Sequence, residues 1–280
     1  MKISVTGARN GHGLLGQAIL VAAAAAGHEV CVLASDITDP LAFAQELPAD
    51  TDVVIHCASL SRVDECEGNP GEALRVNALG TRNVAAACQA INAAMVHIST
   101  DYVFDGTKAT PYLEYDTPCP INAYGRSKAE AERLAQACCT KLFIVRISWL
   151  FGHNGPNFVS TIIKAARSGE PLRVVDDQWG SPSFAPDIAQ ALVMLAATQA
   201  YGIYHFTNSD STNWYAFTRL ILDRLGLHNN LLAQSSDHLT RPARRPANSR
   251  LANTYGPLEG IPPLRSYQDA LAQFLQEIDH

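Results

Sequence analysis

The stretch VTGARNGHGLLGQ, residues 5–17, joins a strand-like apolar run to a helix-like one. A glycine loop at such a junction lets backbone N–H groups approach a pyrophosphate at the N-terminus of a helix. If Gly7, Gly13 and Gly16 are the three glycines, three extra residues separate the first from the second, so the match to G-x-x-G-x-x-G is imperfect. The loop favours a dinucleotide site over the alternative, a plain strand-to-helix turn.

Strand-like and helix-like runs alternate outward from this loop. The strand-like runs are KISVTG, EVCVLA, DVVIHCA, AAMVHIS and LFIVRIS, and the helix-like runs cover 14–26, 71–91, 123–138 and 157–168. Such alternation is typical of βαβ units on a parallel sheet. We therefore expect an α/β fold with a Rossmann-type doubly wound parallel sheet, whose ligands lie beyond the carboxyl ends of the strands.

The pattern loosens after about residue 150. Stretches rich in Gly, Pro and aromatic residues follow, among them DDQWGSPSFAPD and RPARRPANSR. A loop-rich final third beside a regular α/β half suggests a smaller C-terminal lobe that closes over a bound molecule. We expect a dinucleotide-binding domain over 1–150, to which 172–200 returns, and a smaller substrate-binding lobe over 151–171 and 201–280.

Composition narrows the possible partners and the cellular compartment. The formal net charge of −6 argues against nucleic acid or an anionic membrane as partner. The apolar run ILVAAAAAG is shorter than the ~20 residues of a membrane span, and we see no signal peptide at the N-terminus. Seven scattered cysteines without paired spacing favour a reducing, cytoplasmic setting.

No metal site is predicted. The nine histidines have no ligand-like spacing. Asp176 and Asp177 are adjacent carboxylates without a histidine partner, and such a pair is a poor metal site. A turn is the favoured interpretation of these two residues.

Tyr124 and Lys128 are four residues apart on an expected helix, so both project from one face. A neighbouring cation favours the phenolate and should make the tyrosine proton easier to give up than the usual pKa of ~10 allows. A keto group that receives a hydride needs such a proton donor. The alternative is an ordinary solvent-exposed Tyr–Lys pair.

The stretch STDYVFDG, residues 99–106, ends an apolar strand in polar and aromatic residues. A strand that ends in this way usually delivers side chains to a cleft. A hydroxyl there could meet Tyr124, with Thr100 favoured over Ser99. The glycine loop, the strand-end hydroxyl and the Tyr-x-x-x-Lys pattern together resemble the extended short-chain dehydrogenase/reductase family.

Within that family, the chain is similar to the dTDP-4-dehydrorhamnose reductases over nearly its whole length. The matching pieces include RVDECE, VNALGTRNVA, ISTDYVFDG, AYGRSKAEAE, VRISWLFG, VVDDQWGSPS and RPANSRLAN. The resemblance implies transfer of a hydride from NADP or NAD to C4 of a dTDP-4-keto-6-deoxy sugar. It implies that Tyr124 supplies the proton, that Thr100 hydrogen-bonds the ketone oxygen and that Lys128 holds the nicotinamide ribose.

Further contacts follow from the resemblance position by position. The implied cofactor contacts, besides Tyr124 and Lys128, are Gly7, Gly13, Leu14, Leu15, Asp36, Ile37, Cys57, Ala58 and Ser61. The implied substrate contacts, besides Thr100, are Val63, Asp101, Tyr102, Trp149 and Arg250. Arg250 is favoured among the clustered arginines because a guanidinium matches the oxygens of a diphosphate.

The chain departs from the family pattern around the adenosine half of the cofactor. The glycine loop carries its insertion, and the segment after the second strand is short. No acidic residue or arginine ends that strand, where an acidic residue would bind the adenosine ribose. The choice between NAD and NADP therefore stays open.

Three alternatives to this function are considered. Related nucleotide-sugar dehydratases have an Asp-Glu pair after the threonine, whereas Tyr102 follows Asp101 here, so a dehydratase is disfavoured. The chain could be a non-catalytic NADP-binding regulatory subunit of the methionine adenosyltransferase beta type, which resembles these reductases. It could also be a paralogous reductase of another deoxysugar. The expected partner is a small nucleotide-sugar substrate, and a homodimer is possible.

Overall fold

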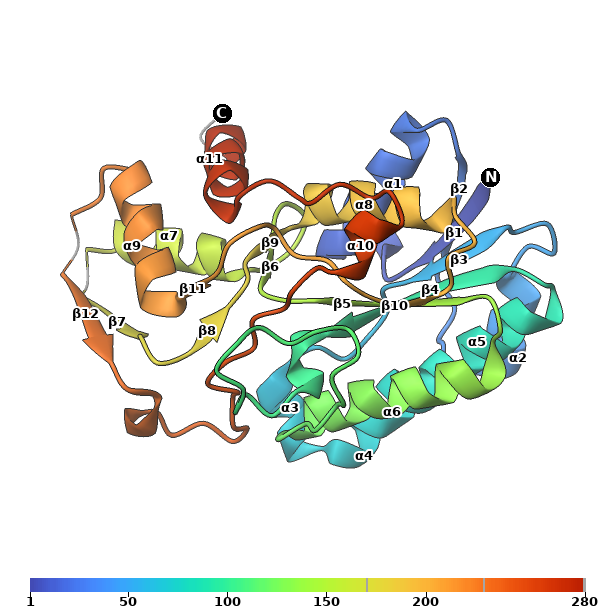
Figure 1. Ribbon diagram of the computed structural model, residues 1–280, viewed down its shortest axis with the longest axis horizontal. Coiled ribbons are helices and arrows are strands. Elements are labelled where there is room, and N and C mark those ends of the chain that lie inside the picture. The colour runs from blue at the N-terminus through green and yellow to red at the C-terminus, as the bar shows by residue number, and fades with distance from the viewer. Residues whose placement is uncertain (170, 229, 279–280) are drawn as a thin grey trace.

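The computed structural model describes residues 1–169, 171–228 and 230–278. Its centre is a parallel six-stranded sheet with the strand order β10-β5-β4-β3-β1-β2 (Figure 1). The strands are β1 (Lys2–Thr6), β2 (Glu29–Leu33), β3 (Val53–His56), β4 (Ala94–Thr100), β5 (Leu142–Ile147) and β10 (Gly202–His205). The order reverses between β1 and β3, which is where doubly wound sheets bind ligands. The predicted fold class is confirmed.

Helices cover both faces of this sheet (Figure 1). One face carries α1 (Leu14–Ala25) and α8 (Ala185–Ala196), packed over apolar side chains of the central strands. The other face carries α2 (Pro40–Glu46), α5 (Thr81–Ala90) and α6 (Ala123–Cys138). Strands β3, β4 and β5 are buried along their whole length, as expected for continuous apolar runs in a covered parallel sheet.

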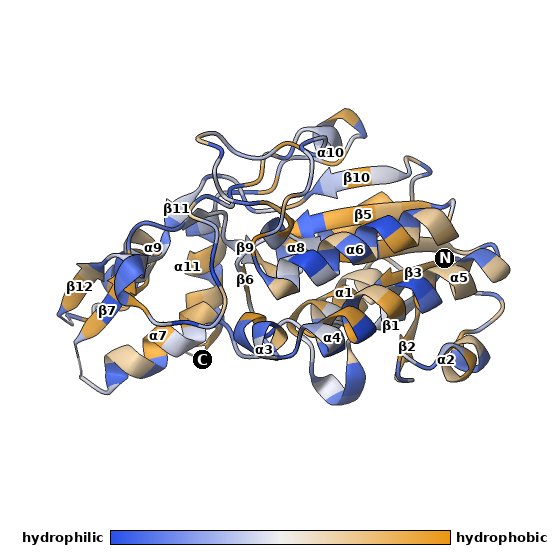
Figure 2. Cartoon of the chain, turned by 90° about the horizontal axis from the view of Figure 1, so that it is seen from below, coloured by the Kyte–Doolittle hydropathy of each residue, from blue (hydrophilic) through white to orange (hydrophobic). Residues whose placement is uncertain are grey.

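Short helical segments complete this part of the chain. They are η1 (Arg9–Gly11), α3 (Val63–Gly68), α4 (Pro70–Ala73), the π-helical η2 (Leu74–Gly80), η3 (Asp101–Val103) and α10 (Tyr255–Leu258). In Figure 2 the strand β5 is mostly hydrophobic in colour, whereas α6 alternates between hydrophilic and hydrophobic stripes. The colouring fits a buried strand beside a helix with one face in water.

A second hydrophobic core surrounds Phe151, Phe184, Phe217 and Phe274, and we call the elements around it the smaller lobe. Its helices are α7 (Phe158–Arg167), α9 (Trp214–Arg224) and α11 (Tyr267–Ile278), with the short η4 (Ser236–His238). Its strands are β6 (Leu150–Phe151), β7 (Leu172–Val175), β8 (Trp179–Gly180), β9 (Ser183–Phe184), β11 (Thr212–Asn213) and β12 (Leu231–Gln234). Figure 1 shows α7, α9 and β12 beyond one end of the main sheet.

Four strands lie on the other side of the expected lobe boundaries. We expected 172–200 to return to the first domain, but β7, β8 and β9 in this range pair with β12, β11 and β6. We expected 201–280 in the smaller lobe, but β10 pairs with β5 as the sixth strand of the main sheet. The helix α8 does return to the main sheet and packs beside α1. The strand β10 follows α8 in the chain and pairs with the free edge of β5. The division into two lobes otherwise stays a prediction.

Within the described residues, no helix combines the length and apolarity needed to cross a membrane. The same residues contain no group of three or more histidine, cysteine, aspartate or glutamate side chains placed to hold a metal ion. Asp177 instead accepts hydrogen bonds from Ser235 and Ser236.

Candidate active site

The glycine loop after β1 is folded so tightly that three of its positions exclude a side chain. Gly7 and Gly13 have φ angles of 75° and 102°, which glycine adopts without steric cost. A Cβ atom on Gly13 would overlap the carbonyl oxygen of Gly7, and one on Gly16 would lie 2.6 Å from it. The inserted residues form the exposed turn η1 outside this contact. The insertion therefore leaves Gly7, Gly13 and Gly16 in close contact beside the N-terminus of α1, and we call these three residues the glycine cradle.

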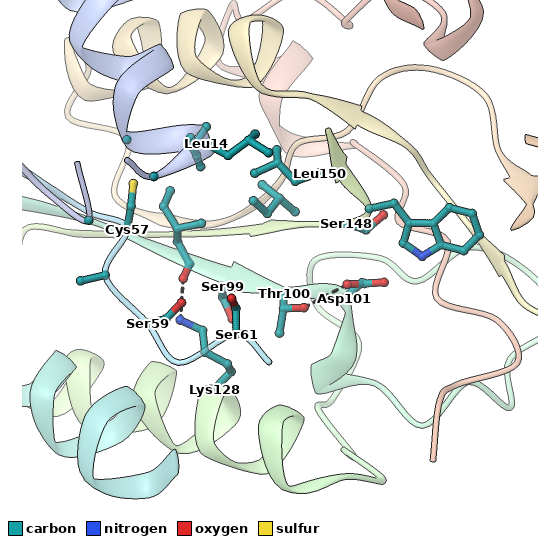
Figure 3. A pocket seen from close by; sticks show the side chains of 18 of the residues that line it. Leu14, Cys57, Ser59, Ser61, Ser99, Thr100, Asp101, Lys128, Ser148 and Leu150 are labelled. Carbon is teal, nitrogen blue, oxygen red and sulfur yellow. Dashed lines mark hydrogen bonds between the residues drawn. The ribbon is translucent and has the colours of Figure 1, made fainter. Parts of the chain in front are cut away.

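A cavity of about 670 Å³ opens at the carboxyl ends of β1, β3, β4 and β5. Figure 3 shows its two sides, with Leu14 at the start of α1 and Lys128 rising from α6. Thr100 and Asp101 lie between them at the end of β4. The cavity occupies the switch point of the sheet, which is the position expected for a bound dinucleotide.

The end of β4 brings a buried hydroxyl and a buried carboxyl to the cavity. Thr100 Oγ1 donates to Asp101 Oδ1 at 3.0 Å and accepts from the backbone N–H of Tyr102 at 3.2 Å. Asp101 is 3% exposed, and its Oδ2 has no hydrogen-bond partner among the described residues. Burial raises the pKa of Asp101 to about 7, although the nearby hydroxyls of Ser249 and Thr100 lower it.

Tyr124 and Lys128 stand on the first two turns of α6. Asn122 caps this helix, because its side chain accepts a backbone N–H of the first turn. Lys128 is almost fully buried, and its Nζ donates to the carbonyl oxygen of Ile98 at 2.7 Å (Figure 3). The same Nζ lies 3.4 Å from Nε2 of His97. Both side chains line the cavity.

The expectation that Lys128 makes the phenol of Tyr124 more acidic is wrong for this structure. Burial is the largest influence and raises the pKa of Tyr124 above its usual value of 10.0, while the Thr100 hydroxyl lowers it as a hydrogen-bond partner. The Lys128 ammonium is engaged with β4 instead, through the carbonyl of Ile98. Burial lowers the pKa of Lys128 to about 8. The resting protein therefore holds Tyr124 as a protonated phenol.

Comparison with known proteins identifies the family. The chain matches the RmlD substrate binding domain family over residues 1–280. It is 36% identical over 277 residues to the dTDP-4-dehydrorhamnose reductase of Mycolicibacterium smegmatis, covering 96% of this chain and 84% of that protein. The chain belongs to the dTDP-4-dehydrorhamnose reductase family. It is also 36% identical over 280 residues to the spore coat polysaccharide biosynthesis protein SpsK of Bacillus subtilis, covering 99% of this chain and 97% of that protein.

Solved structures of the reductase family superpose closely on this chain. The dTDP-4-dehydrorhamnose reductase of Clostridium acetobutylicum has a TM-score of 0.95 at 35% identity and covers 100% of both chains. The dTDP-4-dehydrorhamnose reductase of Bacillus anthracis, in complex with NADP, has a TM-score of 0.94 at 34% identity and covers 99% of both chains. The resemblance inferred from the sequence motifs is confirmed at the level of family and fold.

Most of the site residues implied by the reductase family lie together around the cavity. From the cofactor set, the lining residues are Gly7, Gly13, Leu14, Leu15, Cys57, Ala58 and Ser61. From the catalytic and substrate sets, they are Thr100, Asp101, Tyr124, Lys128 and Trp149. Their roles stay predictions, but one cavity brings these residues together from five separate segments of the chain.

Five implied residues do not line the cavity, and two of them follow β2. Asp36 Oδ1 accepts hydrogen bonds from the backbone N–H and the hydroxyl of Thr38. Ile37 is buried in the core beneath α2 and α5, where its side chain fills the space above Gly80. Contact of either residue with adenine stays a prediction.

The carboxyl end of β2 carries an acidic group that the sequence pattern did not indicate. The backbone N–H of Ala34 donates to Glu46 Oε1 at 2.9 Å, and that of Ser35 donates to Glu46 Oε2 at 2.7 Å. Glu46 is the last residue of α2, a helix that we did not predict. A carboxylate thus stands at the strand end where members of this fold hold the adenosine ribose, but it comes from another element.

The other three implied residues, Val63, Tyr102 and Arg250, do not line the cavity. Val63 begins α3. The Tyr102 ring meets that of Tyr124 edge-on, with centroids 6.0 Å apart. Arg250 donates from Nε to Asn248 Oδ1 at 2.7 Å, so part of its guanidinium is held by the protein.

Trp149 is fixed by strain and by stacking. Its φ angle of 45° is in the left-handed region, which a non-glycine residue rarely adopts. Its ring is stacked on Trp214 of α9 with centroids 3.4 Å apart. A Cβ atom on Gly180 would collide with the Trp149 ring. Backbone strain of this kind concentrates at functional sites, and here it accompanies the stacking of the Trp149 ring on α9.

Several lining residues were missed in the sequence. They are Ser59, Ile98, Ile147, Ser148, Leu150 and Pro156. Most directly precede or follow a strand end that was predicted, so the rule that ligands meet the carboxyl ends of parallel strands would have found them. Pro156 lies in the loop before α7 and had no such signal.

The raised pKa of Asp101 predicts a pH dependence of stability. Folding raises the pKa of Asp101 from 3.8 to about 7. Between these pH values the native state therefore binds one proton more than the unfolded state. This stabilisation is complete near pH 4 and is lost as the pH rises through about 7. We expect the wild type to lose about 2 kcal/mol more unfolding free energy than Asp101→Asn between about pH 5.5 and about pH 8.

The comparison with the variant isolates this carboxyl group. Burial lowers the pKa of His56 and of His205 to about 3, so these groups stabilise the fold as the pH rises toward their unfolded value, in the opposite direction. Both histidines are present in the wild type and in Asp101→Asn, so their contributions cancel in the difference between the two proteins. Urea unfolding at several pH values measures the difference, and parallel curves for the two proteins would contradict the assignment.

Proposed function

We propose that this protein is an NAD(P)H-dependent reductase of the C4 ketone of a dTDP-4-keto-6-deoxy sugar, converting dTDP-4-dehydro-L-rhamnose to dTDP-L-rhamnose. The observation that carries the proposal is the meeting of Thr100, Tyr124 and Lys128 in one cavity with the glycine cradle. The reductase relatives and the NADP complex of a close structural neighbour support it.

The residues present fit a nicotinamide dinucleotide. Gly7, Gly13 and Gly16 leave room for a pyrophosphate where side chains would fill it, beside the N-terminus of a helix whose dipole favours negative charge. Lys128 lies across the cavity as a candidate partner for ribose hydroxyls. When bound, the cofactor supplies the hydride that reduces the ketone carbon.

Tyr124 is the proposed proton donor. Because burial raises its pKa, the phenol keeps its proton until the ketone oxygen becomes strongly basic, and a positioned acid then shortens the path of that proton. Thr100 lines the cavity with the phenol, and we propose that its hydroxyl turns from Asp101 to hold the ketone oxygen. Thr100 is buried and Tyr124 is half-buried where the two side chains line the cavity.

The substrate contacts are proposed on the smaller-lobe side of the cavity. Trp149 lines the cavity with its ring held against Trp214, and we propose that it contacts the sugar or the thymine. Asp101 offers an unpartnered carboxyl oxygen for a sugar hydroxyl. Val63, Tyr102 and Arg250 do not line the cavity. We propose that Val63 and Tyr102 contact the sugar and that Arg250 meets the diphosphate of the substrate. On the cofactor side we propose that Asp36 and Ile37 adjoin the adenine.

A second candidate is a paralogous reductase of another deoxysugar. The relative that favours it is SpsK of Bacillus subtilis, which is named for spore coat polysaccharide biosynthesis. A cytoplasmic location and a division into a dinucleotide-binding domain and a sugar-nucleotide lobe belong to the same proposal. A homodimer stays a prediction.

The test is consumption of reduced cofactor that depends on the sugar nucleotide. We expect oxidation of NADPH or NADH only when dTDP-4-dehydro-L-rhamnose is present, and a rise in melting temperature with NADPH and with dTDP. Turnover only with another dTDP-4-keto-6-deoxy sugar would select the paralogous reductase. A thermal shift with NADPH but neither a dTDP shift nor turnover would favour the regulatory subunit and reject the reductase.

A further inference from the structure

A row of polar side chains crosses the sheet beneath the cavity. Thr6 on β1 pairs in register with His56 on β3, and His56 pairs with His97 on β4. All three are at most 2% exposed, on the sheet face that α5 and α6 cover. Burying polar groups in this way costs free energy unless hydrogen bonds compensate, so the partners of each ring indicate what the row does.

The ring of His56 is fully satisfied by the protein. Thr6 Oγ1 accepts the backbone N–H of Ala58 at 3.1 Å and lies 2.8 Å from His56 Nδ1. His56 Nε2 lies 3.1 Å from Thr81 Oγ1. A hydroxyl can donate or accept, so Thr6 and Thr81 satisfy both ring nitrogens of His56 in either tautomer. The His56 ring is therefore closed on the protein and has no free group for a neighbour.

The ring of His97 differs because one of its nitrogens has no partner. Burial holds the pKa of His97 well below its usual 6.5, with Lys128 and His56 acting in the same direction, so the imidazole is neutral. Nε2 lies 3.4 Å from Lys128 Nζ. An ammonium can only donate, so Nε2 is the acceptor and the ring proton sits on Nδ1. That Nδ1 has no partner among the described residues.

The ammonium of Lys128 is thereby held on two sides. Ile98 O accepts one N–H and His97 Nε2 a second. The third N–H has no acceptor among the described residues, and Lys128 lines the cavity. Two acceptors on one strand fix the direction of the remaining N–H, which an isolated lysine with four rotatable bonds would not do.

We propose that His97 is a positioning residue for the reduction, which accepts from Lys128 and directs its remaining N–H toward a ribose diol of the bound nicotinamide nucleotide. This inference rests on the proposed function and adds a residue to it. A buried imidazole with an unsatisfied nitrogen is a poor choice for packing alone. An apolar side chain would pack there without an unpaired group, but it would leave the ammonium with one protein acceptor.

The test compares three variants of the whole protein by fluorescence titration with NADPH, in the absence of sugar. His97→Met removes the acceptor and puts an apolar side chain of similar length in its place. His97→Gln keeps an acceptor near the Nε2 position. His56→Gln is the matched control, because that ring is equally buried in the same row and makes no hydrogen bond to Lys128. We expect His97→Met to raise the Kd for NADPH about 10-fold or more, since a hydrogen bond to a charged group is lost.

The pH dependence of that Kd separates positioning from packing. Binding of NADPH should weaken as Lys128 loses its proton. The hydrogen bond from the Lys128 ammonium to His97 favours the charged form and so raises the pKa of Lys128. His97→Met should therefore move the alkaline limb to lower pH. The other titratable groups that face Lys128 or His97 are Glu132 on α6, Cys57 after β3 and His56 on β3, and all are unchanged in the His97 variants.

Each outcome decides the proposal. It is supported if His97→Gln restores the affinity and the alkaline limb while His56→Gln behaves as the wild type. It is overturned if His97→Met binds NADPH as the wild type does, if His97→Gln is as weak as His97→Met, or if His56→Gln is equally weak. If the wild type binds NADPH with the expected pattern but reduces no dTDP-linked ketone, the proposed reductase fails while the positioning of Lys128 stands. A wild type that binds neither NADPH nor NADH overturns both.

Discussion

Tyr124→Phe is expected to lower kcat/KM for the sugar ketone about 10²- to 10⁴-fold, because it removes the group that protonates the oxygen as the hydride arrives. The ring stays in place and only the hydroxyl is lost, so the cavity keeps its shape. The change should fall on kcat more than on KM, since the proton is needed in the transition state and not for binding. Steady-state rates of NADPH oxidation measure both constants.

The control is a tyrosine outside the site. Tyr115 is 67% exposed, and Tyr115→Phe should leave the rate unchanged. The Kd of NADPH should stay near that of the wild type in Tyr124→Phe, which separates lost chemistry from lost binding. A Tyr124→Phe enzyme with full turnover would mean that another acid, for which Asp101 is the nearest candidate, delivers the proton.

The fold could be predicted because its signals are local. Apolar runs and turn residues recur along the first 150 residues, and all five strands expected there are present. The helix α2 was missed because its seven residues are too few to show a clear period, and its visible signal is the Asp39–Pro40 start. The strand β10 was expected in the smaller lobe, because no local signal indicates its pairing with β5, which lies about sixty residues earlier in the chain.

The same contrast between local signals and long-range packing applies to the residues of the site. Thr100, Tyr124 and Lys128 could be predicted because strand-end position and helical spacing are readable in the sequence. The contacts of Glu46 with Ala34 and of His97 with Lys128 depend on packing between elements, so no spacing rule points to them. The pKa of Tyr124 was predicted in the wrong direction for the same reason, since burial outweighs the effect of a neighbour four residues away.

A buried ion pair beneath the site is a feature that sequence patterns do not reveal. Arg146 on β5 is 1% exposed and binds Glu132 on α6 through Nε at 3.0 Å and through a second nitrogen at 2.8 Å. Ser99 Oγ donates to the same carboxylate. Arg146 also approaches His205 Nε2 and lies over the ring of Phe104. The pair thus ties α6, which carries Tyr124 and Lys128, to the sheet.

Arg146→Met is expected to lower the free energy of unfolding by about 3–5 kcal/mol, because it leaves the Glu132 carboxylate buried without its counter-charge. The methionine preserves most of the volume, so the loss reports the charge and not a cavity. Urea unfolding gives the change as a lower midpoint at a similar m value. A loss below about 1 kcal/mol would mean that water or Ser99 compensates the carboxylate.

The double variant Glu132→Leu/Arg146→Met separates the cost of an unpaired charge from the worth of the pair. Replacing both partners by apolar side chains removes the stranded carboxylate, and such replacements are often close to neutral. We therefore expect the double variant to recover more than half of the loss, despite the unpaired hydroxyl of Ser99. If it is less stable than Arg146→Met, the network around Ser99 and His205 contributes more than the ion pair. In that case α6 is anchored by hydrogen bonds to the sheet, and Ser99→Ala should destabilise the protein as well.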